Sequence, residues 1–577
     1  MRERLAEQIQ QALGRLLRAA GDEGPVPVVA VDPPRQAEHG DYACNGAMVL
    51  AKRLRRPPRE IAQDLIDELG QAGGLVSRAE IAGPGFVNLW LAGDRWQGLL
   101  GSLLRAGLDY GRSDTGKDQP VQVEFVSANP TGPLSTGHGR QAILGDCIAR
   151  LLENAGYDVT REYYFNNGGR QMRVLGDSVK ARYLERLGRA AAPPENALKD
   201  ENEAWPETLG GLPVVFPRDG YQGDYIGEIA QGMIDREGEG LVDEPGEGRF
   251  REEAESTIFA EIRQTLSALG IDFDVYFSEA SLYDDGKVEE TIGALRETGL
   301  VYEEEGAVWM RFSALGLDRE RVIVKSSGEP TYLLPDVAYH REKFGRGFAK
   351  VIDVQGADHK DQGPFVKAAL QALGLDPARV EFVFHEFVTL SSQGETIKQS
   401  TRKATFITVD ELLSEVGPDV FRLFMVQRRP ESHLDFDLDL AREQDWTKNP
   451  AYYLQYAHAR THGIERQAIQ RGVAMPAADE VPAERLDLPE ELELIKKLGE
   501  FPEVALRAAE TRAPHHVAYY LREVAGLWNP YVQDKNRHGI LTEDAELTAA
   551  RLGLTQAVRV VLARGLDLLG MAAPERM

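Results

Sequence analysis

The sequence predicts a multidomain α/β protein in which a parallel-sheet domain follows an α+β unit and precedes an all-helical unit. Three observations predict this architecture. A chain of 577 residues is too long for a single hydrophobic core. Strand patterns alternate with helical patterns over about 121–183 and again over about 320–390, as in a parallel sheet that meets its ligands at the strand carboxyl ends. From Trp446 onward the pattern is almost wholly helical.

The predicted domains are 1–110, 111–440 and 441–577. The first contains the segment HGDYACNGAMVLAK, a second helix near 59–70 and the strand-like AEIAGPGFVNLWL. Within the second, the stretch 184–310 carries 30 acidic against 10 basic side chains, together with Pro/Gly-rich turns and weak helical patterns. We expect this acidic stretch to be an insertion.

The composition is that of an ordinary globular protein, at 42% hydrophobic and 27% charged. The first residues, MRERLAEQIQQALGRLL, form a charged amphipathic pattern rather than a signal peptide, and no apolar run is long enough to span a membrane. Cys44 and Cys147 lack metal-ligand spacing, so no structural metal is expected. These features predict a cytoplasmic protein. The net charge of −26 does not exclude nucleic acid, because polyanions bind local basic patches.

The stretch from Val121 to Arg140, VQVEFVSANPTGPLSTGHGR, has the most informative chemical pattern. VQVEFV predicts a buried strand, and the Asn, Pro, Gly and Ser residues after it predict a turn. Ser135 or Thr136 is placed to cap the next helix, with His138 in its first turn. An open helix N-terminus after a strand favours phosphate binding, and the motif is neither G-x-G-x-x-G nor a P-loop. Alternatively, the turn residues serve only the backbone.

The segment GETIKQSTRK, residues 394–403, is a loop pattern rich in cations. Lys398, Arg402 and Lys403 flank Ser400, and flexible cations beside small hydroxyl groups suit transient neutralisation of a polyphosphate. A solvated run of surface charge is the alternative, and it is the commoner explanation when the pattern is taken alone.

A third cluster joins TYLLPDVAYH to the GADH segment that follows an apolar, strand-like run. Tyr332 and Asp336 are four residues apart and share one face of the predicted helix. Asp358 and His359 come at a predicted strand end, where α/β sheets meet their ligands. A structural carboxylate and a surface histidine are the alternative interpretation.

The segment NPAYYLQYAHAR, Asn449 to Arg460, predicts an aromatic-rich helix. Its Tyr456 and His458 stand close to Arg460, and aromatic rings interleaved with cations suit stacking on unpaired bases. Aromatic residues at helical spacing also occur in cores, which is the alternative here.

The joint order of these segments resembles the class I aminoacyl-tRNA synthetases, and specifically the arginyl-tRNA synthetases. PLSTGHGR stands in the place of the H-x-G-H signature of that class, and KQSTR in the place of its lysine–methionine–serine–lysine–serine loop. The similarity extends over nearly the whole chain, in the segments HGDYACNGAMVLAK, AGPGFVN, EFVSANPTG, YLLPDVAYH, GADH, NPAYYLQYAHAR and LLGMAAPERM. It implies a Rossmann-type catalytic domain between an N-terminal tRNA-contacting domain and a C-terminal anticodon-binding domain.

The chain departs from the family pattern in both ATP motifs. Ser135 stands where members usually carry the first histidine, while Gln399 and Thr401–Arg402 replace Met and Lys–Ser in the second loop. Ser135 can still donate a hydrogen bond, and Lys398 and Arg402 keep two cations in the loop, although ammonium and guanidinium groups are not interchangeable. We expect altered ATP handling rather than loss of activity.

The resemblance implies a two-step reaction that uses ATP with Mg²⁺. The carboxylate of arginine attacks the α-phosphorus of ATP and pyrophosphate leaves; the terminal ribose hydroxyl of the tRNA then attacks the adenylate carbonyl and AMP is released. Alignment and charge stabilisation accelerate such transfers. Mg²⁺ is expected to arrive with the nucleotide and not in a protein cage. The residues expected to act on ATP are Ser135, Gly137, His138, Lys398, Ser400 and Arg402.

By the same resemblance, Asp336 with Tyr332 receives the guanidinium of arginine, Glu124 and Asn129 hold its other polar groups, and His359 its carboxylate end. A substrate without the guanidinium leaves Asp336 unpaired at a cost of roughly 3–5 kcal/mol, so no editing domain is needed. The family generally needs tRNA present to form the adenylate, and we expect the same here.

The implied macromolecular partner is tRNA(Arg), lying across all three domains with its anticodon loop on the helical one. Tyr456, His458 and Trp528 are the candidate stacking residues, and the chain is expected to be a monomer. Two other functions stay open. Another class I synthetase or nucleotidyltransferase would share the ATP motifs but lack the Tyr332/Asp336 and NPAYYLQYAHAR segments. A catalytically silent paralogue would bind tRNA only.

Overall fold

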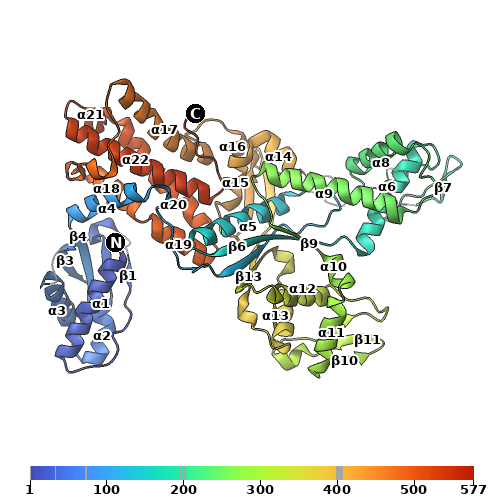
Figure 1. Ribbon diagram of the computed structural model, residues 1–577, viewed down its shortest axis with the longest axis horizontal. Coiled ribbons are helices and arrows are strands. Elements are labelled where there is room, and N and C mark those ends of the chain that lie inside the picture. The colour runs from blue at the N-terminus through green and yellow to red at the C-terminus, as the bar shows by residue number, and fades with distance from the viewer. Residues whose placement is uncertain are drawn as a thin grey trace.

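The computed structural model describes residues 2–32, 34, 36–71, 75–194, 196, 198, 203, 205–397 and 407–577. A parallel sheet lies at the centre, with the N-terminal unit in blue and the C-terminal helices in red on one side of it (Figure 1). The middle of the chain, in green and yellow, forms two projections on the other side. The predicted succession of an α+β unit, a parallel-sheet domain and a helical unit is confirmed.

The central sheet has five parallel strands. They are β5 (Pro120–Glu124), β6 (Asp158–Phe165), β9 (Val275–Ser278), β13 (Lys350–Gly356) and β14 (Val380–His385). Their order is β14-β13-β5-β6-β9, so the chain leaves β5 toward one side and later returns to the other. Open α/β sheets bind ligands at such a reversal, outside the strand carboxyl ends. The carboxyl ends of β5 and β13 therefore mark the expected ligand site.

Helices cover both faces of this sheet. α5 (Thr136–Asn154) and α9 (Arg251–Ala268) lie on one face, and α12 (Leu333–Gly345) and α13 (Gly363–Ala372) on the other. α6 (Gly169–Arg186) packs on α9, while α10 (Glu279–Asp284) and α11 (Lys287–Glu297) pack on α12. Tyr163 and Tyr164 are adjacent on β6 and pack in two separate cores, one containing α5 and the other α12 and α13. α5 lies so close to the sheet that a Cβ atom at Gly145 would come 2.1 Å from Cγ of Phe125.

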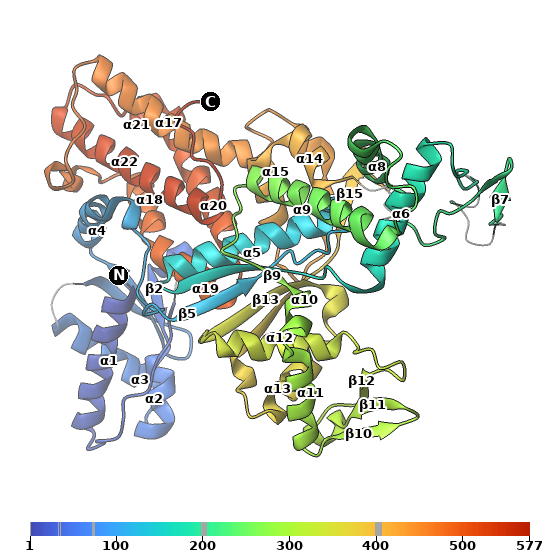
Figure 2. The ribbon, with the colours of Figure 1, turned by 45° about the vertical axis from the view of Figure 1, so that its right-hand side comes forward.

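The acidic segment 184–310, expected to be an insertion, is only partly one. β9 lies within it by sequence but is the edge strand beside β6, and Ile258 and Ile262 of α9 are buried in the main core. The part that projects consists of β7 (Thr208–Leu209), β8 (Leu212–Pro213) and α8 (Asp224–Glu237), far from the N-terminal unit in both views (Figures 1 and 2). Charge did not reveal this division, because strand pairing depends on backbone hydrogen bonds.

Two small sheets flank the central one. β10 (Val301–Glu304), β11 (Ala307–Met310) and β12 (Arg321–Val324) are antiparallel, whereas β15 (Val388–Ser392), β16 (Glu395–Ile397) and β17 (Leu434–Asp437) form a mixed sheet. Three helices accompany the mixed sheet, namely α14 (Val409–Val416), α15 (Pro418–Val426) and α16 (Leu438–Arg442). α15 packs on α5, so this region joins the central sheet to the C-terminal helices.

The N-terminal unit packs helices against a four-stranded antiparallel sheet. Its elements are α1 (Arg2–Ala19), β1 (Val31–Asp32), β2 (Tyr42–Cys44), α2 (Gly46–Leu54), α3 (Pro58–Gln71), β3 (Val76–Ala82) and β4 (Phe86–Leu91), with strand order β1-β2-β4-β3. Leu5, Ile9 and Leu13 recur every four residues on α1 and are fully buried. α4 (Gly93–Ala106) leads out of this unit and packs against C-terminal helices.

The C-terminal unit is a helical bundle. Its helices are α17 (Pro450–Gln470), α18 (Pro489–Gly499), α19 (Phe501–Thr511), α20 (His515–Gln533), α21 (Lys535–His538) and α22 (Ala545–Leu568). α22 packs against α17 and α20 and is buried along most of its length. In the part of the chain that the structure describes, no helix is long and apolar enough to cross a membrane.

Candidate active site

The turn between β5 and α5 places Ser135 and His138 at an open helix N-terminus. Ser135 caps α5: its Oγ accepts a hydrogen bond of 3.5 Å from the backbone N–H of His138. The backbone N–H of Ser135 donates to Nδ1 of His138 at 3.3 Å, so the neutral ring carries its proton on Nε2. Burial lowers the pKa of His138 to about 4. At neutral pH this imidazole is an uncharged donor, next to the positive end of the helix.

The chain that leaves the second ATP motif returns to this turn. Ser135 and Thr408 form an isolated antiparallel bridge, and the backbone N–H of Val409 donates to the carbonyl of Leu134 at 2.9 Å. Thr408 caps α14 in the same way that Ser135 caps α5. Two helix N-termini therefore meet here. The expected ATP-binding residues of the second motif lie outside the described residues; they are Lys398, Ser400 and Arg402.

The carboxylate of Asp336 lies on the first turn of α12, half-buried. Nε2 of Gln362 donates a hydrogen bond to its Oδ2. Burial raises the pKa of Asp336 to about 7; His340 opposes this shift, while Glu124 and Glu279 add to it. Sequence reasoning missed Gln362, although it stands three residues after the GADH segment.

Tyr332 is the residue before α12, and its side chain is 72% exposed. His359 is also exposed, in the turn after β13, with its Nε2 3.5 Å from Oδ2 of Asp358. Asn129 follows β5; its amide donates to Gln171 Oε1 at 2.9 Å and accepts from the Asn166 N–H at 3.2 Å. The structure thus places Asn129 after β5 and His359 after β13, near the strand carboxyl ends. Tyr332 is joined to Asp336 through the helix backbone, the Asp336 N–H donating to the Tyr332 carbonyl at 3.3 Å.

Glu124 ends β5 and is engaged by a cation of the protein itself. Its Oε2 accepts from Nζ of Lys343 at 2.5 Å, and its Oε1 accepts from Oγ of Ser127 at 2.8 Å. The fully buried Lys343 also donates to Asp353 of β13 at 2.8 Å. Burial raises the pKa of Glu124, whereas Lys343 outweighs burial at Asp353 and lowers its pKa. One ammonium group therefore bridges two carboxylates beneath the pocket.

A second link holds α12 to the sheet. Nε2 of His340 lies 2.7 Å from Oδ2 of Asp353, and its Nδ1 lies 2.8 Å from the carbonyl oxygen of Asp336. Asp336, His340 and Lys343 share one helix face, at i, i+4 and i+7. That spacing could have revealed the network from the sequence. At the end of β14, His385 is another residue that sequence reasoning missed; burial lowers its pKa to about 4.

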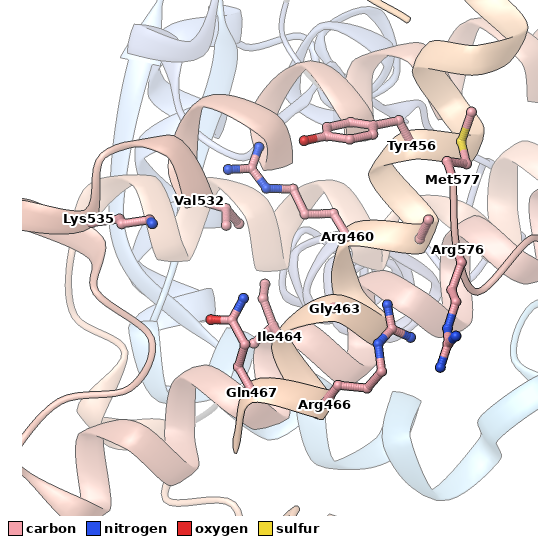
Figure 3. Close-up of a pocket in the computed structure, with 11 residues that line it drawn as sticks. Tyr456, Arg460, Gly463, Ile464, Arg466, Gln467, Val532, Lys535, Arg576 and Met577 are labelled. Carbon is pink, nitrogen blue, oxygen red and sulfur yellow. The ribbon is translucent and has the colours of Figure 1, made fainter. Parts of the chain in front are cut away.

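A cavity of about 450 Å³ lies in the helical unit, between α17, α20 and the C-terminus. Figure 3 shows the ring of Tyr456 and the guanidinium groups of Arg460, Arg466 and Arg576 around one space. Tyr456 stacks on Trp446, with ring centroids 4.0 Å apart. An aromatic face among cations suits an unpaired nucleotide.

The other two residues expected to stack on RNA are buried. Trp528 is 0% exposed, and its indole N–H donates to the carbonyl of Ala457 at 3.2 Å. His458 is 3% exposed, and its Nδ1 lies 2.9 Å from the carbonyl oxygen of Pro574. Neither side chain is accessible to a base, so the expectation that they stack on RNA does not hold. Both are parts of the bundle core.

Family models match three consecutive parts of the chain. They are "Arginyl tRNA synthetase N terminal domain" over 3–91, "tRNA synthetases class I (R), catalytic domain" over 100–201 and 240–429, and "DALR anticodon binding domain" over 454–577. The arginine–tRNA ligase of Desulfotalea psychrophila is 46% identical over 578 residues, covering 99% of this chain and 100% of its own. That of Geobacillus thermodenitrificans is 42% identical over 582 residues, covering 100% and 99%. The chain belongs to the arginyl-tRNA synthetases.

Solved structures agree. The arginyl-tRNA synthetase of Thermus thermophilus is 26% identical and matches 100% of both chains with a TM-score of 0.72. A methionyl-tRNA synthetase of Mycobacterium tuberculosis in complex with methionyl-adenylate, 15% identical, matches 79% of this chain and 95% of its own with a TM-score of 0.52, which shows the fold alone. The activity of this synthetase is arginine–tRNA ligation in tRNA aminoacylation, with ATP as the nucleotide of its class.

The family match also bears on the projecting region of the catalytic domain. The catalytic-domain match skips 202–239, which contains most of the projecting region of β7, β8 and α8. Among the residues that the structure describes, no group of three or more His, Cys, Asp or Glu side chains could hold a metal ion. The domain limits at 110 and 440 stay predictions.

Proposed function

We propose that this synthetase forms arginyl-adenylate at the carboxyl ends of β5 and β13 and then transfers the arginyl group to tRNA(Arg), releasing AMP. The observation that carries the proposal is the pairing of two unlike sites at one sheet edge. The Ser135–His138 turn offers neutral donors and a positive helix end to an anion. Asp336 with Gln362 offers acceptors to a cation. ATP and arginine are the two substrates that such a pair of sites fits.

On the phosphate side, Nε2–H of His138, the hydroxyl of Ser135 and the backbone at Gly137 bind the nucleotide. Lys398, Ser400 and Arg402 close over the leaving pyrophosphate. The bridge between Ser135 and Thr408 supports this assignment, because it holds Thr408, five residues after Lys403 in the sequence, beside the first motif. Mg²⁺ enters with ATP and neutralises its phosphates.

On the arginine side, Asp336 pairs with the guanidinium in a planar, charge-assisted contact, with Tyr332 at the rim. Glu124 and Asn129 face the remaining polar groups of the amino acid, and His359 lies toward its carboxylate end. Because Glu124 is already held by Lys343, it offers a carboxylate of fixed position. In the ranges that the structure describes, Asp336 has no such cation beside it, so in this proposal the guanidinium of the substrate supplies its counter-charge.

For tRNA, we propose that the cavity around Tyr456 receives an anticodon-loop base, with its cations on the neighbouring phosphates. We also propose that the enzyme requires tRNA to form the adenylate. It is proposed to be a monomer and to act in the cytoplasm. Pyrophosphate exchange with and without tRNA tests the tRNA requirement, and sedimentation velocity tests the monomeric state.

The deciding experiment is charging of bulk tRNA by the purified protein with each amino acid in turn, ATP and Mg²⁺. Arginine alone should be charged. Asp336→Asn keeps the side-chain shape but loses the charge, and should lower kcat/KM for arginine by roughly 3 kcal/mol, about 100-fold or more, with KM for ATP little changed. His138→Ala should instead lower the rate of ATP use.

Matched variants separate the two sites from general damage. Lys350→Met removes a half-exposed cation paired with Glu381 at 3.1 Å, away from both sites, and should leave charging intact. If Asp336→Asn charged arginine normally, the guanidinium assignment would be wrong. If the unmodified chain bound tRNA but formed no adenylate, the two-step proposal would be overturned.

A further inference from the structure

A small basic surface lies where α15, α19 and α20 meet. It consists of Arg429 after α15, Arg507 on α19, and His515, His516 and Tyr519 on α20. The two histidine rings have centroids 4.3 Å apart, and the ring of Tyr519, which is 42% exposed, meets His515 edge-on at 5.5 Å. Both arginine side chains are exposed. We refer to these five residues as the α20 surface.

The positive charge of the α20 surface has no internal counter-charge. Within the described part of the chain, Arg429 and Arg507 form no ion pair, although the whole chain carries a net charge of −26. Arg512, close by in sequence, differs in this respect because it pairs with Glu381 at 3.2 Å. An anionic partner would supply the counter-charge that Arg429 and Arg507 lack among the described residues.

The pKa values of His515 and His516 are both lowered by burial and by the positive charges around them. Burial, together with the charges of His516 and Arg429, lowers the pKa of His515 to about 4. Burial also lowers the pKa of His516, and Arg507 and Arg429 add to the shift. No carboxylate among the described residues offsets these effects. The buried Nδ1 of His515 has no hydrogen-bond partner in this part of the chain, and the uncapped N-terminus of α20 adds its own positive end.

The loop that carries Arg429 is tied through hydrogen bonds to α5, the helix that begins at the Ser135–His138 turn. Arg140, on α5 two residues after His138, donates to the carbonyl oxygens of Arg429 at 3.0 Å and Glu386 at 2.7 Å. The backbone N–H of Glu386 in turn donates to the carbonyl of Pro430 at 2.9 Å. The loop that carries Arg429 is therefore fixed to the phosphate-binding helix. α20 itself runs from this loop to the cavity around Tyr456, since Val532 near its other end lines that cavity.

We propose that the α20 surface binds the sugar–phosphate backbone of the tRNA between the anticodon loop and the active site. Arg429 and Arg507 contact phosphates, His516 acts as a neutral donor, and Tyr519 packs against a ribose or an exposed base. His515, at 3% exposed, lies behind these side chains and supports the ring of Tyr519. Such contacts position the RNA and carry no sequence information. This inference rests on the proposed function, because it takes tRNA as the partner of both ends of α20.

The test is the salt dependence of tRNA binding by the full-length protein. Release of counterions makes the affinity fall with salt, with a slope set by the number of phosphates contacted. Arg429→Gln with Arg507→Gln should reduce that slope by about two units and weaken binding about tenfold at moderate salt. The loss should be equal for tRNA(Arg) and for a tRNA of another identity, because backbone contacts do not read bases.

A matched control is Arg485→Gln. Arg485 is exposed in the helical unit but pairs with Asp544 at 2.6 Å and Glu546 at 2.7 Å, so its removal should leave the slope unchanged. The double variant should keep its KM for arginine and ATP and, at saturating tRNA, its charging rate. Tyr519→Ala should weaken tRNA binding without changing the slope.

The outcomes separate this inference from the proposed function. A double variant that charges arginine with an unchanged salt slope would overturn the inference and leave the function intact. Failure of the parent protein to charge arginine would overturn the function. A slope lost for tRNA(Arg) alone would show that the surface reads sequence, which also contradicts the inference.

Discussion

Ser135 and Thr408 are far apart in the sequence, yet they pair in an isolated antiparallel bridge and each caps the helix that follows it. The bridge brings the positive ends of α5 and α14 together at the carboxyl edge of the central sheet. Thr408 follows the cationic second motif in the sequence, and this contact fixes Thr408 itself beside the Ser135 turn. Ser135, which replaces the usual first histidine of the family pattern, has a structural role in the capped turn.

Replacement of Ser135 by alanine removes the acceptor of the His138 backbone N–H. The free energy of unfolding should fall by about 1 kcal/mol, and KM for ATP should rise because the His138 ring loses the turn that orients it. Urea unfolding and the ATP dependence of charging measure the two effects. Ser135→Thr keeps the hydroxyl and should retain both properties. An unchanged KM for ATP in the alanine variant would contradict a role of this turn in nucleotide binding.

Arginine binding should depend on pH through Asp336. Burial raises the pKa of this carboxyl to about 7, and only its ionised form pairs with a guanidinium. kcat/KM for arginine should therefore increase about tenfold per pH unit up to about pH 7 and level off above it. His138 does not account for this limb, because burial lowers its pKa to about 4. Measurement of kcat/KM for arginine between about pH 5.5 and 8.5 tests this rise, and Asp336→Asn should abolish the pH dependence.

The same shift predicts a pH dependence of stability in the absence of arginine. The native state holds a proton on Asp336 up to about pH 7, whereas the unfolded chain releases it near pH 4. The stability gained from this proton is complete below about pH 4 and is lost as pH rises through about 7. Asp336→Asn should thus gain stability over the parent on going from acid to about pH 8, as urea unfolding at both pH values would show. A constant difference would mean that Asp336 is not buried enough to shift.

Lys343 should contribute strongly to stability and to the arginine pocket. Lys343→Met leaves the buried carboxylates of Glu124 and Asp353 without their shared cation, at a cost of about 3–5 kcal/mol. KM for arginine should also rise, since Glu124 loses its fixed position. Lys350→Met is the matched control, because its half-exposed pair with Glu381 should contribute less than about 1 kcal/mol. Thermal unfolding and arginine kinetics of both variants test this prediction. Equal losses of stability in Lys343→Met and Lys350→Met would contradict it.

Tyr456 and Trp528 should respond oppositely to truncation. Trp528→Ala empties a fully buried site and should lower the free energy of unfolding by about 3–5 kcal/mol. Tyr456→Ala should leave stability less affected but weaken tRNA binding by about 1–3 kcal/mol, because its ring lines the cavity of the helical unit. Calorimetry measures the loss of stability in each variant, and tRNA titration measures the loss of RNA affinity. Normal tRNA affinity of the Tyr456 variant would remove this cavity from the RNA surface.

Some parts of the site were predictable from local sequence because local hydrogen bonds determine them. The cap at Ser135 follows from a small hydroxyl residue before a helical pattern, and the shared face of Tyr332 and Asp336 follows from helical spacing. Lys343 was missed for a different reason: its carboxylate partners lie on β5 and β13, and no local pattern pairs a helix lysine with two separate strands. The aromatic residues of α17 and α20 were predicted as one RNA-facing set, but packing divides them.

The sequence by itself determined the class of the chain, the succession of three kinds of domain and the candidate residues for the substrates, because hydrophobic periodicity, helix caps and motif order are local properties. Only the tertiary structure decided which of these residues are available. It engages Glu124 with Lys343, places Gln362 on Asp336, buries Trp528 and makes β9 part of the central sheet. Burial and pairing depend on which segments meet in space, and those contacts are set by the packing of the whole chain.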